Sequence, residues 1–207
     1  MKRMIWVSKS DSFNAANEFD DDYYLSMSRE ERLETLQFLR EIYFKVKKAL
    51  RMKVEKDYEE LLKLLNKHKV KYCIIGAYAV AFYAKPRYTK DMYILVEPSS
   101  ENSEKIVSAL NDFGFKSLKL SEEDFCRKGR IVQLGYKPVR IDIITSIEGS
   151  RFKDVWNNKV ISTYGDEKVF FIGIDELIKN KQCSKRPQDK IDLDLLMKAK
   201  KKMVIKN

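Results

Sequence analysis

Hydrophobic and polar positions repeat along the chain with two different periods, and their succession outlines the fold. The clearest helical stripe lies in the N-terminal quarter, where apolar residues recur every three or four positions: Leu33, Leu36, Leu39, Ile42, Tyr43, Val46 and Leu50. Ser28 and Glu31 precede the stripe and fit the capping box that begins many helices. A stripe this apolar must cover either the core of its own chain or a second chain.

After residue 54, short apolar runs typical of buried strands alternate with amphipathic segments typical of helices. The predicted strands cover residues 72–75, 91–96, 131–136, 139–145 and 169–172. The predicted helices cover residues 58–65, 77–83, 106–113, 152–156, 174–181 and 187–202. This order predicts an α/β (α+β) fold with a mixed sheet flanked by helices. We divide the chain into an N-terminal helical segment (1–53), a core (54–172) and C-terminal helices packing on the core (173–207).

The composition indicates a folded chain with one core and an attachment. Of the 207 residues, 44% are hydrophobic and 35% are charged, which is enough apolar side chain to offset the entropy of ordering. Lysine and arginine number 41 against 31 aspartates and glutamates, a formal net charge of +10. This excess predicts attraction to polyanions such as nucleic acid or nucleotides, although surface charge serving solubility gives the same count.

Cysteine and histidine usage argues against a zinc site or a disulfide framework. Cys73, Cys126 and Cys183 are far apart and show no CxxC spacing, and His68 is the single histidine. No apolar run approaches the roughly 20 residues needed to cross a bilayer, and the apolar run at the start is too short for a signal peptide. We expect a cytoplasmic protein with no membrane partner.

Two aspartates on predicted strands are the candidate metal ligands. Asp91 and Tyr93 lie two residues apart on one strand and so point to the same face, and Asp142 lies on a later strand that can pair beside it. Carboxylate oxygens suit Mg²⁺, which often takes one or two protein carboxylates and completes its shell with phosphate and water. Spacing alone also allows a simpler interpretation, in which the aspartates end their strands without a role.

A phosphate-binding turn is the second candidate feature. Gly76 and Ala77 end an apolar strand and open a helix, where free N–H groups and the positive end of the helix dipole can receive a phosphate. Arg87, Thr89 and Lys90 add positive charge and a hydroxyl just before the candidate metal ligands. Read singly, each of these is an ordinary loop residue.

Taken together, residues 74–77, 86–96 and 141–145 resemble the nucleotidyltransferase superfamily related to polymerase beta. In that family a Gly followed by Gly or Ser begins the helix, an Asp-x-Asp or Asp-x-Glu pair binds two metals, and a third Asp on a later strand joins them. The matching residues here are Gly76, Asp91 and Asp142. Two residues depart from the pattern, because Ala77 stands where Gly or Ser is usual and Tyr93 stands where the second carboxylate belongs.

The chain also resembles stand-alone nucleotidyltransferases of toxin-antitoxin and abortive-infection systems, which share the Arg-x-Thr-x-Asp approach of residues 87–91. Lys181, Arg186, Asp189 and Asp192 resemble a K-x4-R-x2-D-x2-D segment that closes many such domains and brings a lysine toward the nucleotide pocket. A capped, charged surface helix is the alternative for this segment. The resemblance covers residues 58–196, and residues 23–44 look similar to a helical segment that accompanies some members.

The resemblance implies a protein that binds a nucleoside triphosphate with Mg²⁺ and moves a nucleoside monophosphate onto an RNA, protein or small-molecule hydroxyl. It places the metal on Asp91 and Asp142, with Tyr93 as the third catalytic position. It places the nucleotide on Gly76, Ala77, Arg87, Thr89 and Lys181. Two other functions stay open: a catalytically silent relative that binds nucleotide or a partner protein, and a basic RNA-binding module.

The identity of residue 93 is the sequence feature that best separates an active enzyme from a catalytically silent relative. Two-metal transfer needs several carboxylate oxygens within a few ångströms, one ion activating the attacking hydroxyl and the other holding the triphosphate. A phenol with a pKa near 10 stays neutral at pH 7 and is a poor Mg²⁺ ligand. We therefore expect one metal at most, with triphosphate binding kept and transfer slow or absent.

Overall fold

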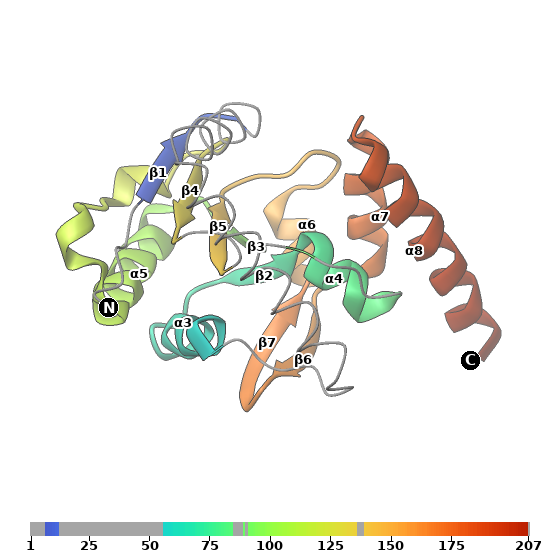
Figure 1. Cartoon of the computed structure of the whole chain (residues 1–207), viewed down its shortest axis with the longest axis horizontal. Helices are drawn as coiled ribbons and strands as arrows, with labels where there is room; N and C mark the ends of the chain where they lie inside the picture. Colours follow the sequence, from blue (N-terminus) through green and yellow to red (C-terminus); the bar gives the residue numbers. More distant parts are fainter. Residues whose placement is uncertain (1–6, 13–55, 85–88, 90, 136–138, 207) are drawn as a thin grey trace, which may run out of the picture.

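The computed structural model describes residues 7–12, 56–84, 89, 91–135 and 139–206, and these form one mixed sheet with helices around it (Figure 1). The sheet has seven strands in the order β1-β4-β5-β3-β2-β7-β6. Their bounds are β1 Val7–Ser10, β2 Tyr72–Ile75, β3 Asp91–Val96, β4 Ile131–Leu134, β5 Arg140–Ile144, β6 Val160–Tyr164 and β7 Glu167–Phe171. The predicted fold class, a mixed sheet flanked by helices, is confirmed.

The helices within the described residues also follow the predicted order. They are α3 Lys56–Lys67, α4 Gly76–Tyr83, α5 Ser100–Leu110, α6 Phe152–Asn157, α7 Ile174–Cys183 and α8 Pro187–Lys206. Short turns, η1 Asn111–Phe115, η2 Lys116–Leu118 and η3 Glu122–Asp124, lead from α5 to β4. The Ser99 side chain caps α5 by accepting a hydrogen bond from the Asn102 N–H, 3.3 Å away.

The candidate site residues Asp91, Tyr93 and Asp142 lie on two neighbouring strands, β3 and β5. β3 runs parallel to β5, and β2 runs antiparallel to β3. β4 and β5 pair antiparallel, and β7 joins β2 in parallel. The register across β3 and β5 sets Asp91 beside Arg140 and Tyr93 beside Asp142. Asp142 therefore lies on the neighbouring strand, as predicted, but directly opposite Tyr93.

Two strands were not predicted. β1 pairs with β4 and so belongs to the sheet, although it lies within the first 53 residues, where only a helical segment was expected. The predicted helix over residues 28–50 lies outside the described residues. β6 pairs with β7 at the other edge of the sheet, where most of its side chains are exposed or half-buried.

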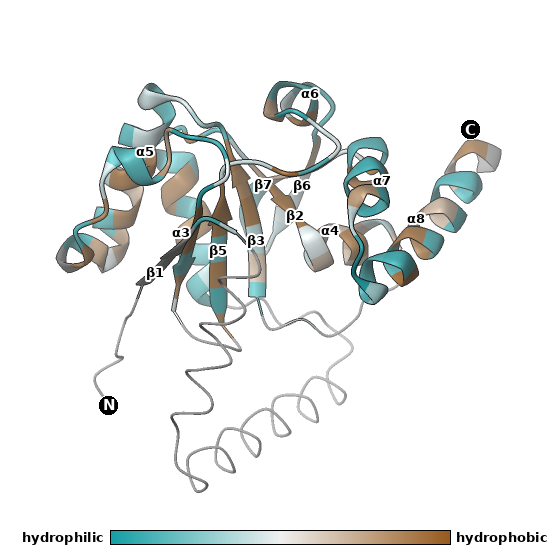
Figure 2. Cartoon of the chain, turned by 90° about the horizontal axis from the view of Figure 1, so that it is seen from above, coloured by the Kyte–Doolittle hydropathy of each residue, from teal (hydrophilic) through white to brown (hydrophobic). Residues whose placement is uncertain are grey.

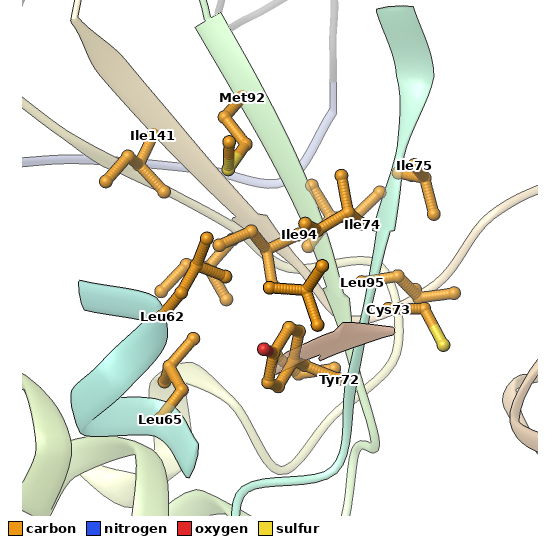
Figure 3. Packing of buried hydrophobic residues seen from close by; sticks show 14 of the residues in the cluster. Leu62, Leu65, Tyr72, Cys73, Ile74, Ile75, Met92, Ile94, Leu95 and Ile141 are labelled. Carbon is orange, nitrogen blue, oxygen red and sulfur yellow. The ribbon is translucent and has the colours of Figure 1, made fainter. Parts of the chain in front are cut away.

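One part of the core lies between one face of the sheet and helices α3 and α5. Figure 3 shows Met92 and Ile94 of β3 pointing toward Leu62 and Leu65 of α3, and all four are fully buried. Because side chains alternate along a strand, Asp91 and Tyr93 point to the opposite face. Figure 2 shows apolar strands at the centre of the sheet, with polar residues along α5, α7 and α8 and an apolar α4.

The C-terminal helices lie with α4 on the side of the sheet away from α3 and α5 (Figures 1 and 2). α7 contacts α8, and both contact α4. Leu177 of α7 and Leu196 of α8 are fully buried members of the hydrophobic core. Among the helices described, none combines the length and apolar character that a membrane span needs.

Candidate functional site

Most of the predicted site residues line one cleft of about 770 Å³. Its walls come from the residues after β1, the β2–α4 turn, the start of β3, the segment that leads into β4, the residues after β5, and the end of α7 with the start of α8. The predicted residues that line it are Gly76, Ala77, Thr89, Asp91, Tyr93 and Lys181. Asp142 lies beneath this lining and is only 1% exposed. Arg87 and Lys90 lie outside the described residues.

The turn between β2 and α4 lines the cleft with Ile75, Gly76 and Ala77, which have no polar side chains, so its polar groups there are those of the backbone. Gly76 has a φ of 66°, in the left-handed region that favours glycine. Within the described part of the chain, no side-chain hydrogen bond caps α4 at Ile75. A Cβ on Gly76 would lie 3.2 Å from Cδ2 of Tyr93. The missing side chain therefore makes room for the tyrosine ring, which lies against the start of the helix.

Arg140 joins the two aspartates into one buried ion network. Its Nη2 donates hydrogen bonds to Asp91 Oδ2 at 2.9 Å and to Asp142 Oδ2 at 2.8 Å. Its Nε lies 2.8 Å from Asp142 Oδ1, a charge contact rather than an aligned hydrogen bond. The side chains of Arg140 and Asp142 are 3% and 1% exposed, whereas Asp91 is 15% exposed toward the cleft. Thr89 Oγ1 donates to the second oxygen of Asp91 at 2.9 Å.

Burial and charge shift the acid–base behaviour of this network. Burial raises the pKa of Asp142 to about 6, although Arg140 and a hydrogen bond from the Tyr93 hydroxyl both act to lower it. Burial also raises the pKa of Tyr93 above its ordinary value, and the nearby charges of Asp142 and Asp91 raise it further. The phenol is thus neutral at physiological pH and acts as a hydrogen-bond donor to Asp142.

These residues, as arranged, do not fit the magnesium site that the resemblance implies. Both aspartates direct an oxygen at the same guanidinium nitrogen, and the third position carries a neutral phenol. In the part of the chain that the structure describes, no three His, Cys, Asp or Glu side chains are grouped so that they could hold a metal ion. Magnesium binding by Asp91 and Asp142 stays a prediction that this geometry does not favour.

Lys181, on the opposite wall, is held by acidic residues of α8. Its ammonium donates to Asp189 and, at 2.9 Å, to Asp192 Oδ2, and all three side chains are buried. Ser184 and Arg186 also donate to Asp189. Burial acts to raise the pKa of Asp189, but the hydrogen bonds from Lys181 and Ser184 outweigh it and leave that pKa below its ordinary value. The predicted K-x4-R-x2-D-x2-D segment therefore forms one ion-paired cluster.

The formal charges of the described residues that line the cleft cancel. The acidic ones are Asp11, Asp91, Glu148 and Asp189, and the basic ones are Arg130, Lys181, Lys185 and Arg186. This described part of the lining therefore carries none of the net positive charge that a groove for a nucleic-acid backbone needs. Lys185 and Arg186 are exposed cations on the connection between α7 and α8. They are the lining groups best able to meet an anionic ligand.

Arg140 is the missed residue that most changes the interpretation of the site, and Lys185 was missed as well. One signal was available, because Arg140 precedes Asp142 by two residues on a strand and so shares its face. Its contact with Asp91 depends on the pairing register of two strands almost fifty residues apart in the chain, and the sequence pattern does not give that register.

Comparison with known proteins gives little beyond this geometry. No protein-family model matches the chain, and no curated protein matches it. Among solved structures, the chain is similar to the lincosamide antibiotic adenylyltransferase LnuA with lincomycin bound. The identity is 18% and the TM-score 0.46, over 69% of this chain and 96% of that one. A likeness this distant carries no inference about activity, substrate or metal.

Proposed function

We propose that this chain is a nucleotidyltransferase-like protein that binds a nucleoside triphosphate in the cleft without transferring nucleotide at an appreciable rate. One observation carries the proposal: the Gly76 turn, Asp91 and Lys181, which come from three separate segments, line the same cleft. These segments are the ones on which the sequence resemblance rests. The toxin-antitoxin setting, an RNA acceptor and a partner protein stay predictions.

The phosphate end of the ligand would lie at the start of α4. The first N–H groups of this helix and its positive dipole end suit an anion, and Ile75, Gly76 and Ala77 all line the cleft. Lys185 and Arg186 would offset phosphate charge from the facing wall. A cleft of about 770 Å³ lies within the range usual for small-molecule sites.

Transfer is disfavoured because Asp91 and Asp142, the two candidate acids, are both engaged in hydrogen bonds and are poorly suited to activating an attacking hydroxyl. Asp91 and Asp142 both accept hydrogen bonds from Arg140, and Asp142 also accepts one from Tyr93. A general base must reach the proton that it removes, and Asp142 is only 1% exposed with both carboxylate oxygens against Arg140, so it is poorly placed to reach a hydroxyl in the cleft. Binding without turnover is the function that this arrangement supports best.

Equilibrium dialysis with each of the four labelled ribonucleoside triphosphates tests the proposal. Replacing both Lys185 and Arg186 with alanine should weaken triphosphate binding by roughly tenfold. The matched control replaces Lys190 and Lys198, exposed lysines of α8 outside the cleft lining, and should bind like the wild type. Circular dichroism confirms that each variant is folded. The proposal fails if no triphosphate binds, or if both double variants lose affinity equally.

A further inference from the structure

We infer that Arg140 is a built-in cation for the Asp91–Asp142 pair, so that the wild-type chain holds no divalent metal ion between these carboxylates. The register of two neighbouring strands brings the three side chains together. β3 and β5 are parallel with Asp91 opposite Arg140, and Asp142 follows Arg140 by two residues. All three side chains therefore emerge on the same face of the sheet.

The guanidinium takes the place where the carboxylates converge. A single nitrogen, Nη2 of Arg140, lies 2.9 Å from Asp91 Oδ2 and 2.8 Å from Asp142 Oδ2. A magnesium ion shared by these two oxygens on the side of the guanidinium would sit about 2.1 Å from each and would overlap that nitrogen. Metal and guanidinium therefore compete for the same side of these oxygens.

The charge of the cluster also disfavours a metal ion. Arginine cannot be deprotonated in proteins, so Arg140 stays positively charged at every accessible pH. The two ionised carboxylates and Arg140 together therefore carry a formal charge of −1 rather than −2. A divalent cation that entered beside Arg140 would meet a full positive charge in a buried setting, where screening by water is weak.

Arg140 also has little freedom to leave. Its side chain is 3% exposed, and its main-chain oxygen accepts a hydrogen bond from the buried Tyr58 hydroxyl at 3.1 Å, which ties β5 to α3. Moving the guanidinium into water would leave Asp142 buried without its cation. A metal ion could bind here only by displacing Arg140 in this way. The following experiment detects that displacement as Mn²⁺ binding by the wild type.

Titration of Mn²⁺ into nucleotide-free protein, followed by the loss of the free-ion EPR signal, tests the inference. The wild type should take up no Mn²⁺ at this pair. Arg140→Gln should bind one Mn²⁺ at least roughly a hundredfold more tightly than the wild type, because a full positive charge beside the ion is gone. Adding Asp142→Asn to Arg140→Gln should abolish that binding. Arg140→Met, which keeps most of the packing volume, serves as a second variant should the Gln variant fail to fold.

Arg151→Gln is the matched control, because Arg151 is an exposed arginine that pairs with Asp154 at 3.0 Å outside the cleft. It frees a carboxylate in the same way and should bind no Mn²⁺. One-to-one Mn²⁺ binding by the wild type that Asp91→Asn removes would overturn the inference. So would a folded Arg140→Gln protein that binds no Mn²⁺. Since the probe is the metal ion alone, neither result depends on whether a triphosphate binds.

Discussion

The ring of Tyr93 packs against Gly76 so closely that a Cβ added to the glycine would lie 3.2 Å from the ring. The tyrosine that stands in the place of a carboxylate of the resembled motif thus also packs against the start of the helix that the same motif uses for phosphate. Its hydroxyl donates a hydrogen bond to the Asp142 carboxylate. One residue therefore shapes both halves of the candidate site, and the predictions below test its contacts and those of its neighbours.

Gly76→Ala should destabilise the protein by roughly 2–3 kcal/mol, since it adds both left-handed backbone strain and crowding against Tyr93. Gly129→Ala is the control. Gly129 also has a positive φ, 83°, but a Cβ there meets no atom within 4 Å, so only the strain of about 1 kcal/mol remains. Urea unfolding of both variants measures the difference. Equal losses would show that the contact with the ring costs nothing.

Tyr93→Phe should cost about 1 kcal/mol, because Asp142 loses a hydrogen-bond donor in a buried setting. It should also raise the pKa of Asp142 further, since the hydroxyl stabilises the carboxylate. A double-mutant cycle with Asp142→Asn isolates the pair. A coupling free energy indistinguishable from zero would mean that the hydroxyl does not act through Asp142.

Asp142 gives the stability of the protein a pH dependence of unusual sign. Because its pKa is about 6 in the folded protein and about 3.9 in an unfolded chain, the folded state binds the proton more tightly between these values. Its contribution to stability therefore falls by roughly 3 kcal/mol as the pH rises from about 4 to about 6. The difference in unfolding free energy between wild type and Asp142→Asn should show this fall. A difference that rises with pH would mean that Arg140 outweighs burial.

Lys181→Met should destabilise the protein by roughly 3–5 kcal/mol, because Asp189 and Asp192 stay buried without the ammonium that pairs with them. Lys190→Met removes an exposed lysine from α8, the helix that carries both aspartates, and should change stability by about 0.5 kcal/mol or less. Thermal or urea unfolding compares the two. Similar small effects would show that the cluster around Asp189 contributes little to the fold.

The central strands and the candidate acids could be predicted because their signals are local. β2 and β3 have the predicted bounds, since each is a short apolar run closed by turn residues. Alternation along β3 places Asp91 and Tyr93 together on one face, as predicted, and the structure shows that this face points away from α3. The two edge strands could not be found in the same way. β1 is four residues with a lysine and two serines, and it pairs with β4 more than a hundred residues further along the chain.

The contacts of Arg140, Tyr93 and Lys181 could not be predicted, because they depend on strand register and on the direction of each side chain. Spacing placed Asp142 on a strand beside Asp91, but it could not show that Tyr93 lies opposite Asp142 and that Arg140 lies opposite Asp91. It also could not show that the Lys181 ammonium points to the acids of α8, since that contact forms between two helices. Periodicity gives the face of each element, whereas the partner across the interface is set by tertiary packing.

The central claim is binding without transfer, and one filter-binding measurement tests it most directly. The full chain is incubated with triphosphate labelled at the α-phosphate, with total RNA present, once with Mg²⁺ and once with EDTA. Half of each sample is filtered under native conditions and half after denaturation. The account predicts label on the native protein in both buffers and none on denatured protein or RNA. Label that survives denaturation and requires Mg²⁺ would contradict it, as would the absence of label from the native protein.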